Sequence, residues 1–309
     1  MEASLNLAQK KTTDCLDLKY PDLQGKTIIL TGGSSGIGRE AAKILLKSGA
    51  NLILIGRRTQ LLDQLDQIPK KKGTLTVHAC DLERPNEIKS VISRIVMDNQ
   101  GKIDGVVNCA GIIESKDFSE TTLQEWDMVM NINLRAPMQI ISMLIPFMKF
   151  TGGSIVNVSA SPVPRPKQTI FSVSKACLDS LTQCAALELG GFGIRVNGVA
   201  PGITDTSLRM HQVEQRITQA QNDNLMKAAG SETPMKTINT AKNIADSIVW
   251  LLSEQSSYVN GEIICVDGGA SIKTATSEIA WHLPEPVVTE SLLSQGMKAL
   301  NLGKFFAQK

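Results

Sequence analysis

Short runs of aliphatic and β-branched residues alternate along the chain with longer stretches in which apolar residues recur at helical spacing. Seven of the short runs are rich in β-branched residues and look like strands buried on both faces of a sheet. They are KTIILTG, NLILIG, TLTVHACD, IDGVVNCAG, GSIVNVSA, IRVNGVAPG and EIICVDGG. Alternating strands and helices predict parallel pairing through right-handed crossovers. We therefore expect an α/β protein with an open, doubly wound parallel sheet of about seven strands.

Helical patterns occupy the intervals between these runs. One follows Gly38, one follows residues 57–59, and one begins near Pro85, a residue suited to a first helical turn. The two longest cover about residues 122–150 and 168–189. Three regions do not follow the alternation: an N-terminal extension (1–24), a polar helix-prone segment that is a candidate lid (about 206–231), and a C-terminal tail (273–309). We expect a single domain over residues 25–272 with an extension at each end.

Composition narrows the classes of partner. The chain has 309 residues, of which 42% are hydrophobic and 20% charged, and its net charge of +2 selects neither nucleic acid nor an anionic membrane. The first residues lack the apolar core of a secretory signal and are too acidic for a confident transit peptide. No apolar run approaches membrane-spanning length. We expect an intracellular protein, cytoplasmic by default, with a mitochondrial location left open.

The six cysteines show neither a CxxC pair nor the spacing of metal ligands, and most of them stand within apolar runs. This pattern predicts reduced, buried thiols and no metal site.

A glycine-rich turn, LTGGSSGIGRE, follows the first predicted strand and opens a helix. Gly32, Gly36 and Gly38 permit a tight turn, close approach of the backbone to a pyrophosphate, and close helix–strand packing. The helix N-terminus then faces the phosphates. A glycine-rich loop alone is a weak signal, but its position between a strand and a helix strengthens it. The sequence therefore predicts a Rossmann-type dinucleotide site.

The residues after the second predicted strand indicate which dinucleotide is bound. An NAD-binding fold usually has an acidic residue here to hold the ribose hydroxyls, whereas this chain has Gly56, Arg57 and Arg58. A guanidinium suits a 2′-phosphate, so Arg57 favours NADP(H). The alternative is that both arginines only begin a solvated helix.

Several motifs in register then resemble the short-chain dehydrogenase/reductase family over about residues 25–272. They are TGGSSGIG, CDL with Asp81, NCAG at 108–111, MNINLRAP with Asn133, Lys175, VAPGITDT and YVNGEIICVDGG. Within the family, the sequence most resembles small carbonyl and sugar reductases such as L-xylulose reductase, which is an analogy at the level of fold. The resemblance implies that the following residues bind the cofactor: Gly32, Ser34, Ser35, Gly36, Ile37, Gly38, Arg57, Asp81, Leu82, Asn108, Ala110, Gly111, Lys175, Pro201, Gly202 and Thr206.

The family's chemistry is hydride transfer between nicotinamide and a carbonyl or carbinol carbon, with a tyrosine as acid or base, a lysine, a serine and an asparagine. Lys175 and Asn133 occupy their positions, but Phe171 stands where the resemblance places the tyrosine. The serine position is most naturally Ala160, with Ser159 and Ser161 on either side. Phenylalanine has no proton to donate, so the standard reaction is expected to be impaired.

Three hypotheses follow. The protein binds NADP(H) but is catalytically impaired, serving as a structural or cofactor-sensing subunit. Alternatively, it is an active carbonyl or enoyl-CoA reductase whose proton donor has moved to Asp179, one helical turn after Lys175, or to a flanking serine. The third possibility, a scaffold that binds no nucleotide, does not explain why the glycines, Arg57 and Lys175 are present together.

Partners follow from the same patterns. An active protein would take a small carbonyl substrate. The two long helices carry more apolar positions than one sheet face needs, and the family pairs through them, so we expect a homodimer or homotetramer. A monomeric mass in light scattering would contradict this. The tail has apolar residues at helical spacing and is a second candidate contact, either with another copy or within a larger complex.

Overall fold

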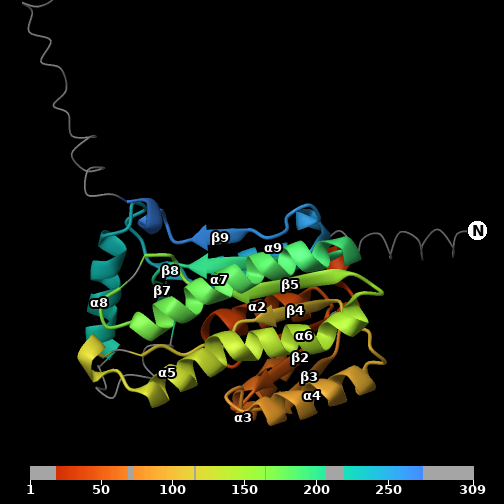
Figure 1. The fold of residues 1–309 in the computed structure, drawn as a ribbon. Helices are drawn as coiled ribbons and strands as arrows, with labels where there is room; N and C mark the ends of the chain where they lie inside the picture. Colours follow the sequence, from red (N-terminus) through yellow and green to blue (C-terminus); the bar gives the residue numbers. More distant parts are fainter. Residues whose placement is uncertain (1–18, 69–72, 115, 164, 207–218, 274–309) are drawn as a thin grey trace, which may run out of the picture. The chain divides into compact units, whose positions relative to one another are not determined.

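The computed structural model describes residues 19–68, 73–114, 116–163, 165–206 and 219–273. Within them, seven parallel strands form one sheet in the order β3-β2-β1-β4-β5-β6-β9 (Figure 1). The order reverses between β1 and β4, which is the switch point of a doubly wound sheet. The predicted Rossmann-type fold is therefore confirmed.

Each predicted strand run contains one strand of this sheet. The strands are β1 (Thr27–Thr31), β2 (Asn51–Gly56), β3 (Leu75–Ala79), β4 (Gly105–Asn108), β5 (Gly153–Val158), β6 (Ile194–Pro201) and β9 (Ile263–Val266). All residues of β1 and β4 are buried, as expected for central strands covered on both faces. The sequence did not predict the small second sheet, in which β7 (Thr204–Asp205) pairs with β8 (Asn239–Thr240).

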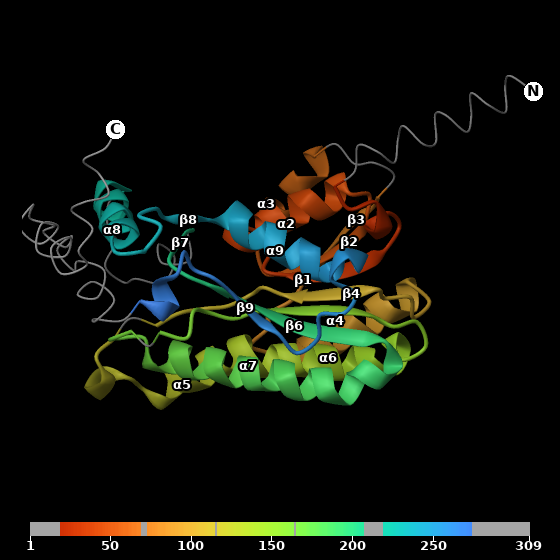
Figure 2. The ribbon, with the colours of Figure 1, turned by 90° about the horizontal axis from the view of Figure 1, so that it is seen from above.

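Helices cover both faces of the sheet (Figure 2). One face is covered by α2 (Gly36–Lys47), α3 (Thr59–Asp63) and α9 (Ala241–Leu252), whose buried residues form one core cluster. The other is covered by α4 (Pro85–Asp98), α5 (Leu123–Met130), α6 (Ala136–Met148) and α7 (Thr169–Leu189). Helix α9 was not among the predicted helices. The short elements η1 (Pro21–Leu23), η2 (Gln64–Gln67), η3 (Phe118–Glu120), η5 (Gly190–Phe192), η6 (Glu254–Ser256) and η7 (Ala270–Ile272) are 3₁₀ turns.

The long apolar helical region predicted over residues 122–150 is two helices joined by a π-helical segment, η4 (Asn131–Arg135). By length and composition alone the continuous stretch Leu123–Met148 could cross a membrane, which corrects the expectation that no run approaches that length. However, Ile140, Ile141 and Leu144 are buried in the core beside the sheet. Burial beside the sheet therefore explains only part of the apolarity of this stretch, since Leu123, Met138 and Phe147 remain exposed.

The regions predicted to lie outside the alternation are described in part. At the end of the N-terminal extension, Tyr20 and Leu23 are buried, and the Tyr20 hydroxyl donates to the carbonyl of Asp246 at 3.4 Å. The candidate lid contains helix α8 (Gln219–Ser231), while residues 207–218 lie outside the described residues. The tail after residue 273 also lies outside them.

The prediction of mostly buried thiols was wrong. Among the described residues Cys80 is buried and Cys109 partly buried, but Cys177, Cys184 and Cys265 are exposed. Both Cys177 and Cys184 lie on the outer side of α7, where small and apolar residues remain exposed along the helix.

Candidate functional site

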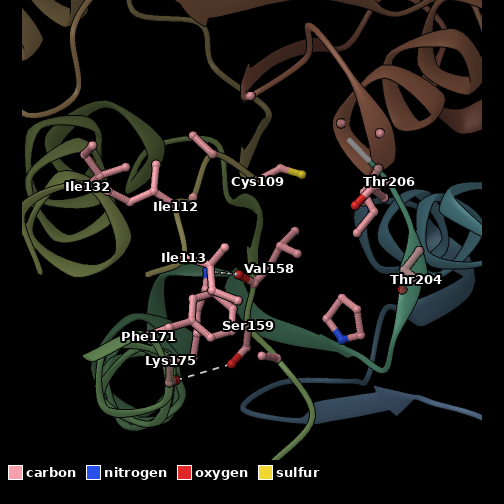
Figure 3. Close-up of a pocket in the computed structure, with 18 of the residues that line it drawn as sticks. Cys109, Ile112, Ile113, Ile132, Val158, Ser159, Phe171, Lys175, Thr204 and Thr206 are labelled. Atoms are coloured by element: carbon pink, nitrogen blue, oxygen red, sulfur yellow. Dashed lines mark hydrogen bonds between the residues drawn. The ribbon is translucent and has the colours of Figure 1, made fainter. Parts of the chain in front are cut away.

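A cavity of about 670 Å³ opens at the carboxyl ends of the central strands. Its wall combines the glycine-rich turn after β1, the ends of β2 and β3, the loops after β4, β5 and β6, and one face of α7 (Figure 3). Ligands of open parallel sheets bind at this end of the strands, next to the switch point. Most of the predicted cofactor residues line this cavity: Gly32, Ser34, Ser35, Gly36, Ile37, Gly38, Arg57, Asp81, Leu82, Ala110, Gly111, Lys175, Pro201, Gly202 and Thr206.

The glycines of the turn are required by close packing. Gly32 has a φ of 78°, and a Cβ there would lie 2.7 Å from the backbone nitrogen of Ala110. A Cβ on Gly38 would overlap the carbonyl oxygen of Gly32. The first turn of α2 can therefore approach the end of β1 only with glycine at these positions. This leaves the backbone of the turn facing the cavity.

The two arginines after β2 have different contacts. Arg58 donates to the hydroxyls of Ser34 at 2.7 Å and Ser35 at 3.1 Å, and so ties the end of β2 to the glycine-rich turn. Arg57 is exposed at the rim of the cavity and makes no hydrogen bond or ion pair with the described residues. This leaves the Arg57 guanidinium available to a ligand. The sequence reading did not foresee the anchoring role of Arg58.

Asp81 and Asn108, both predicted to bind the cofactor, make hydrogen bonds within the protein. The Asp81 carboxylate accepts from the backbone nitrogen of Glu83 at 3.1 Å and lies 3.8 Å from Arg84. Asn108 does not line the cavity. Its amide donates to Asn157 at 2.8 Å, while its own buried oxygen has no partner among the described residues. Asn108 therefore supports the sheet beneath the cavity.

Lys175 lies at the centre of the cavity wall. It is 6% exposed, and its ammonium donates to the carbonyl of Val158 at 2.6 Å. Burial lowers its pKa to about 8. The ring of Phe171, one helical turn earlier, lies 5.8 Å from the Lys175 nitrogen and also lines the cavity. The lysine thus faces an aromatic ring at the position where the family pattern has a tyrosine hydroxyl.

The serines of the loop after β5 point to protein partners. The Ser159 hydroxyl donates to the carbonyl of Lys175 at 3.3 Å, and the Ser161 hydroxyl donates to Asp267 at 3.2 Å. Ala160 lies between them on the cavity wall. Neither tyrosine of the chain supplies a hydroxyl, since Tyr20 and Tyr258 are both absent from the lining.

Asn133 lies in the π-helical segment and is fully buried without lining the cavity. Its oxygen accepts from the backbone nitrogen of Ile112 at 2.9 Å, and its amide donates to the carbonyl of Ile112 at 2.9 Å and to Ser174 at 3.0 Å. The side chain thus fixes the loop after β4 to α7. Because the Asn133 side chain does not reach the cavity, the structure gives no support to its predicted catalytic role.

Asp179 lines the cavity on the same face of α7 as Phe171 and Lys175. Burial raises the pKa of its carboxyl, while the Ser159 hydroxyl and the Lys175 ammonium lower it. One oxygen, Oδ1, is buried and has no hydrogen-bond partner among the described residues. The Asp179 carboxyl is therefore partly withdrawn from solvent beside Lys175.

Glu114, which the sequence reading missed, is buried in the loop after β4. Its carboxylate accepts from the backbone nitrogens of Ile170 and Phe171, the latter at 2.9 Å, and so satisfies the N-terminal turn of α7. It therefore sets where Phe171 and the helix begin. Because Glu114 lies 56 residues before its partner in the chain, no local sequence pattern predicts this contact.

Comparison with known proteins places this geometry in a family. Residues 32–271 match the family model described as enoyl-(acyl carrier protein) reductase. The chain belongs to the short-chain dehydrogenase/reductase family. Among curated relatives of this family, the 3-oxoacyl-[acyl-carrier-protein] reductase FabG of Thermotoga maritima is 33% identical over 257 residues, covering 81% of this chain and 99% of the relative. The short-chain dehydrogenase/reductase aba4 of Botryotinia fuckeliana is also 33% identical, covering 79% and 96%.

Solved structures of the family agree with this assignment. A putative NAD(P)-dependent gluconate 5-dehydrogenase from Beutenbergia cavernae, with bound NADP at low occupancy, has a TM-score of 0.73 at 26% identity. The match covers 82% of this chain and 99% of that one. The ligand-free aldohexose dehydrogenase of Thermoplasma acidophilum has a TM-score of 0.72 at 26% identity, covering 83% and 98%. Relatives of this short-chain dehydrogenase/reductase thus include NADP-binding proteins.

Proposed function

We propose that this short-chain dehydrogenase/reductase binds NADP(H) and is impaired in the family's standard carbonyl–carbinol chemistry. The observation that supports this most directly is the wall beside Lys175, where a phenylalanine ring faces the lysine and Ala160 stands between two serines with other partners. Such a protein serves as a structural or cofactor-sensing subunit.

The residues present fit the cofactor. The open backbone of the glycine-rich turn suits a pyrophosphate, and the hydroxyls of Ser34 and Ser35 lie beside it. Arg57, at the rim, suits a 2′-phosphate through charge-assisted hydrogen bonds. Asp81 and Leu82 offer a polar and an apolar contact for an adenosine. Bound NADP(H) would supply or accept a hydride at the far end of the same cavity.

The missing hydroxyls carry a large kinetic cost. A positioned general acid contributes on the order of 10²–10⁴-fold, and loss of one oxyanion donor costs about 10²–10³-fold. Lys175 still lies in place to hold a nicotinamide ribose, and the positive charge of its ammonium would lower the pKa of an acidic neighbour. No tyrosine lies next to it for that charge to act on.

Nucleotide titration combined with turnover assays tests the proposal. We expect saturable NADPH binding, tighter than NADH binding, together with no measurable turnover of diketones, sugars or enoyl-CoA esters. Absence of NADPH binding would contradict the first half of the proposal. Rapid turnover of any of these substrates by the unmodified protein would contradict the second half.

The buried, unpartnered oxygen of Asp179 favours a second candidate function. Burial raises the pKa of this carboxyl, which favours its protonated form, and its place on the cavity wall would let it deliver a proton to a substrate there. The protein would then be an NADP(H)-dependent carbonyl or enoyl reductase with a relocated donor. Native turnover that is abolished in Asp179→Asn, with NADPH affinity retained, would establish this second function in place of the first.

A further inference from the structure

We propose that the part of the cavity beyond Lys175 takes an apolar, uncharged carbonyl compound and discriminates against polyhydroxylated sugars. The inference deepens the proposed function, because it names the ligand class of the same site. It holds whether that ligand is reduced or only bound alongside NADPH.

The wall beyond Lys175 is formed by residues from four separate segments. The loop after β4 contributes Ile112 and Ile113, the loop after β5 contributes Pro162 and Val163, α7 contributes Phe171, and the segment after β6 contributes Ile203. Figure 3 shows Ile112, Ile113 and Phe171 around the same part of the cavity. All six side chains are apolar. A ligand here gains chiefly by removing its own apolar surface from water.

Hydrogen-bonding groups near this wall are mostly engaged with the protein. Ser159 donates to a helix carbonyl, Ser161 donates to Asp267, and Lys175 donates to Val158. Of the further polar side chains that line the cavity here, Arg165, Gln168, Ser172 and Asp179 all come from α7 or the segment leading into it. Thr204, on the opposite side, donates to the carbonyl of Gly202 at 3.0 Å. A sugar has hydroxyls on every carbon. Those directed at the isoleucines would be desolvated without a partner, which lowers the affinity for a sugar.

The beginning of α7 is also closed to anions. A helix N-terminus ordinarily attracts negative charge through its free N–H groups and its dipole. Here the Glu114 carboxylate already accepts from the nitrogens of Ile170 and Phe171 and places a negative charge at that end. The N-terminus of α7 therefore offers no anion site next to Phe171, and the nearest cationic side chains on the wall are Arg165 and Lys175.

Two five-carbon ketones with the carbonyl at the same position provide a matched test: 2-pentanone and L-xylulose. Each is titrated by calorimetry into the full-length protein, with saturating NADPH and again without nucleotide. The series is extended through 2-heptanone and 2-nonanone. We expect affinity to rise about three- to fourfold for each added methylene that is buried, and we expect L-xylulose to bind more weakly than every ketone.

Two variants locate the site. Ile113→Asn and Val163→Asn should each weaken 2-nonanone binding by about tenfold or more, because each replaces apolar wall with an amide. Met97→Gln, an apolar-to-polar change at an exposed position of α4 outside the cavity, serves as the matched control. Circular dichroism and thermal melting of each variant identify a general folding defect.

The outcomes separate the two proposals. If the wild-type protein does not bind NADPH but its affinity for the ketones still rises with chain length, the proposed function is contradicted and the ligand class is supported. L-xylulose binding as tightly as 2-pentanone, or ketone affinity that does not change with chain length, would overturn the ligand class. Equal effects of Met97→Gln and Ile113→Asn on ketone binding would overturn it as well.

Discussion

The two ends of the cavity differ in how many of the family's functional residues they keep. At the end formed by the glycine-rich turn, Gly32 and Gly38 allow the close packing that a dinucleotide fold needs, and Arg57 faces outward at the rim. At the other end, the lysine remains but faces the Phe171 ring, and the neighbouring serines are bound to protein groups. In the function proposed above, nucleotide binding and proton delivery depend on largely different residues, so one can be lost without the other.

The largest expected effect comes from restoring the missing hydroxyls. Phe171→Tyr combined with Ala160→Ser should raise NADPH-dependent reduction of simple apolar diketones by about 10²-fold or more, because a positioned acid contributes that much. Steady-state kinetics of NADPH oxidation measure the change. Phe150→Tyr, which adds the same hydroxyl at an exposed position, is the control. A double variant that binds NADPH yet shows no gain would mean that more than the two hydroxyls is missing.

The next effect concerns Lys175 and pH. Its folded-state pKa of about 8 lies below the ordinary 10.5 because burial disfavours the charged form. The unfolded chain therefore holds the Lys175 proton more tightly between about pH 8 and 10.5, so the contribution of Lys175 to the free energy of unfolding should rise with pH across that window, by on the order of 3 kcal/mol at most. The thiols of Cys80 and Cys109, whose pKa values burial raises to about 11 and about 12, contribute in the opposite direction above pH 9, so the effect is measured as the difference between wild type and variant. Urea unfolding without nucleotide at several pH values measures this. Lys175→Met should lose the rise, whereas Lys102→Met, at an exposed position, should keep it.

A smaller effect is expected at the nucleotide end. Arg57→Glu should weaken NADPH binding by about 10- to 100-fold, since a charge-assisted contact with the 2′-phosphate becomes a repulsion. NADH, which lacks that phosphate, should be affected far less. Fluorescence titration of both nucleotides provides the comparison, with Arg94→Glu on exposed α4 as the control. Equal losses for the two nucleotides would place Arg57 outside the 2′-phosphate site.

The smallest effect tests the support between the two ends. Glu114→Ala should lower the free energy of unfolding by about 1 kcal/mol, because two backbone N–H groups at the start of α7 lose their acceptor. Glu114→Gln keeps one acceptor oxygen and should lose less. Urea denaturation distinguishes them, with exposed Glu120→Ala as the reference. Glutamine and alanine variants of equal stability would show that the carboxylate contributes nothing to the helix start.

The sequence predicted the sheet well because parallel strands leave short runs rich in apolar and β-branched residues, and each of the seven runs contained a strand. The expectation of burial on both faces was wrong for β3 and β9, which lie at the two edges of the sheet and have no buried residue. The sequence also predicted the glycine-rich turn, whose residues are adjacent in the chain. It missed contacts that join distant segments, such as Glu114 with the start of α7 and Arg58 with Ser34. Exposed Cys177 and Cys184 were misjudged, because the apolar run around them lies on a helix with one outward face.

Asn133 has a consequence for how members of this family are compared. Its buried side chain forms hydrogen bonds with Ile112 and Ser174 and so joins a loop to a helix. Replacing it would leave buried polar groups unpaired, so natural selection for folding alone would keep an asparagine there. The persistence of this residue in a descendant lineage is therefore no record of activity. A family member that has lost activity can therefore keep this part of the family's sequence motif for as long as it must fold.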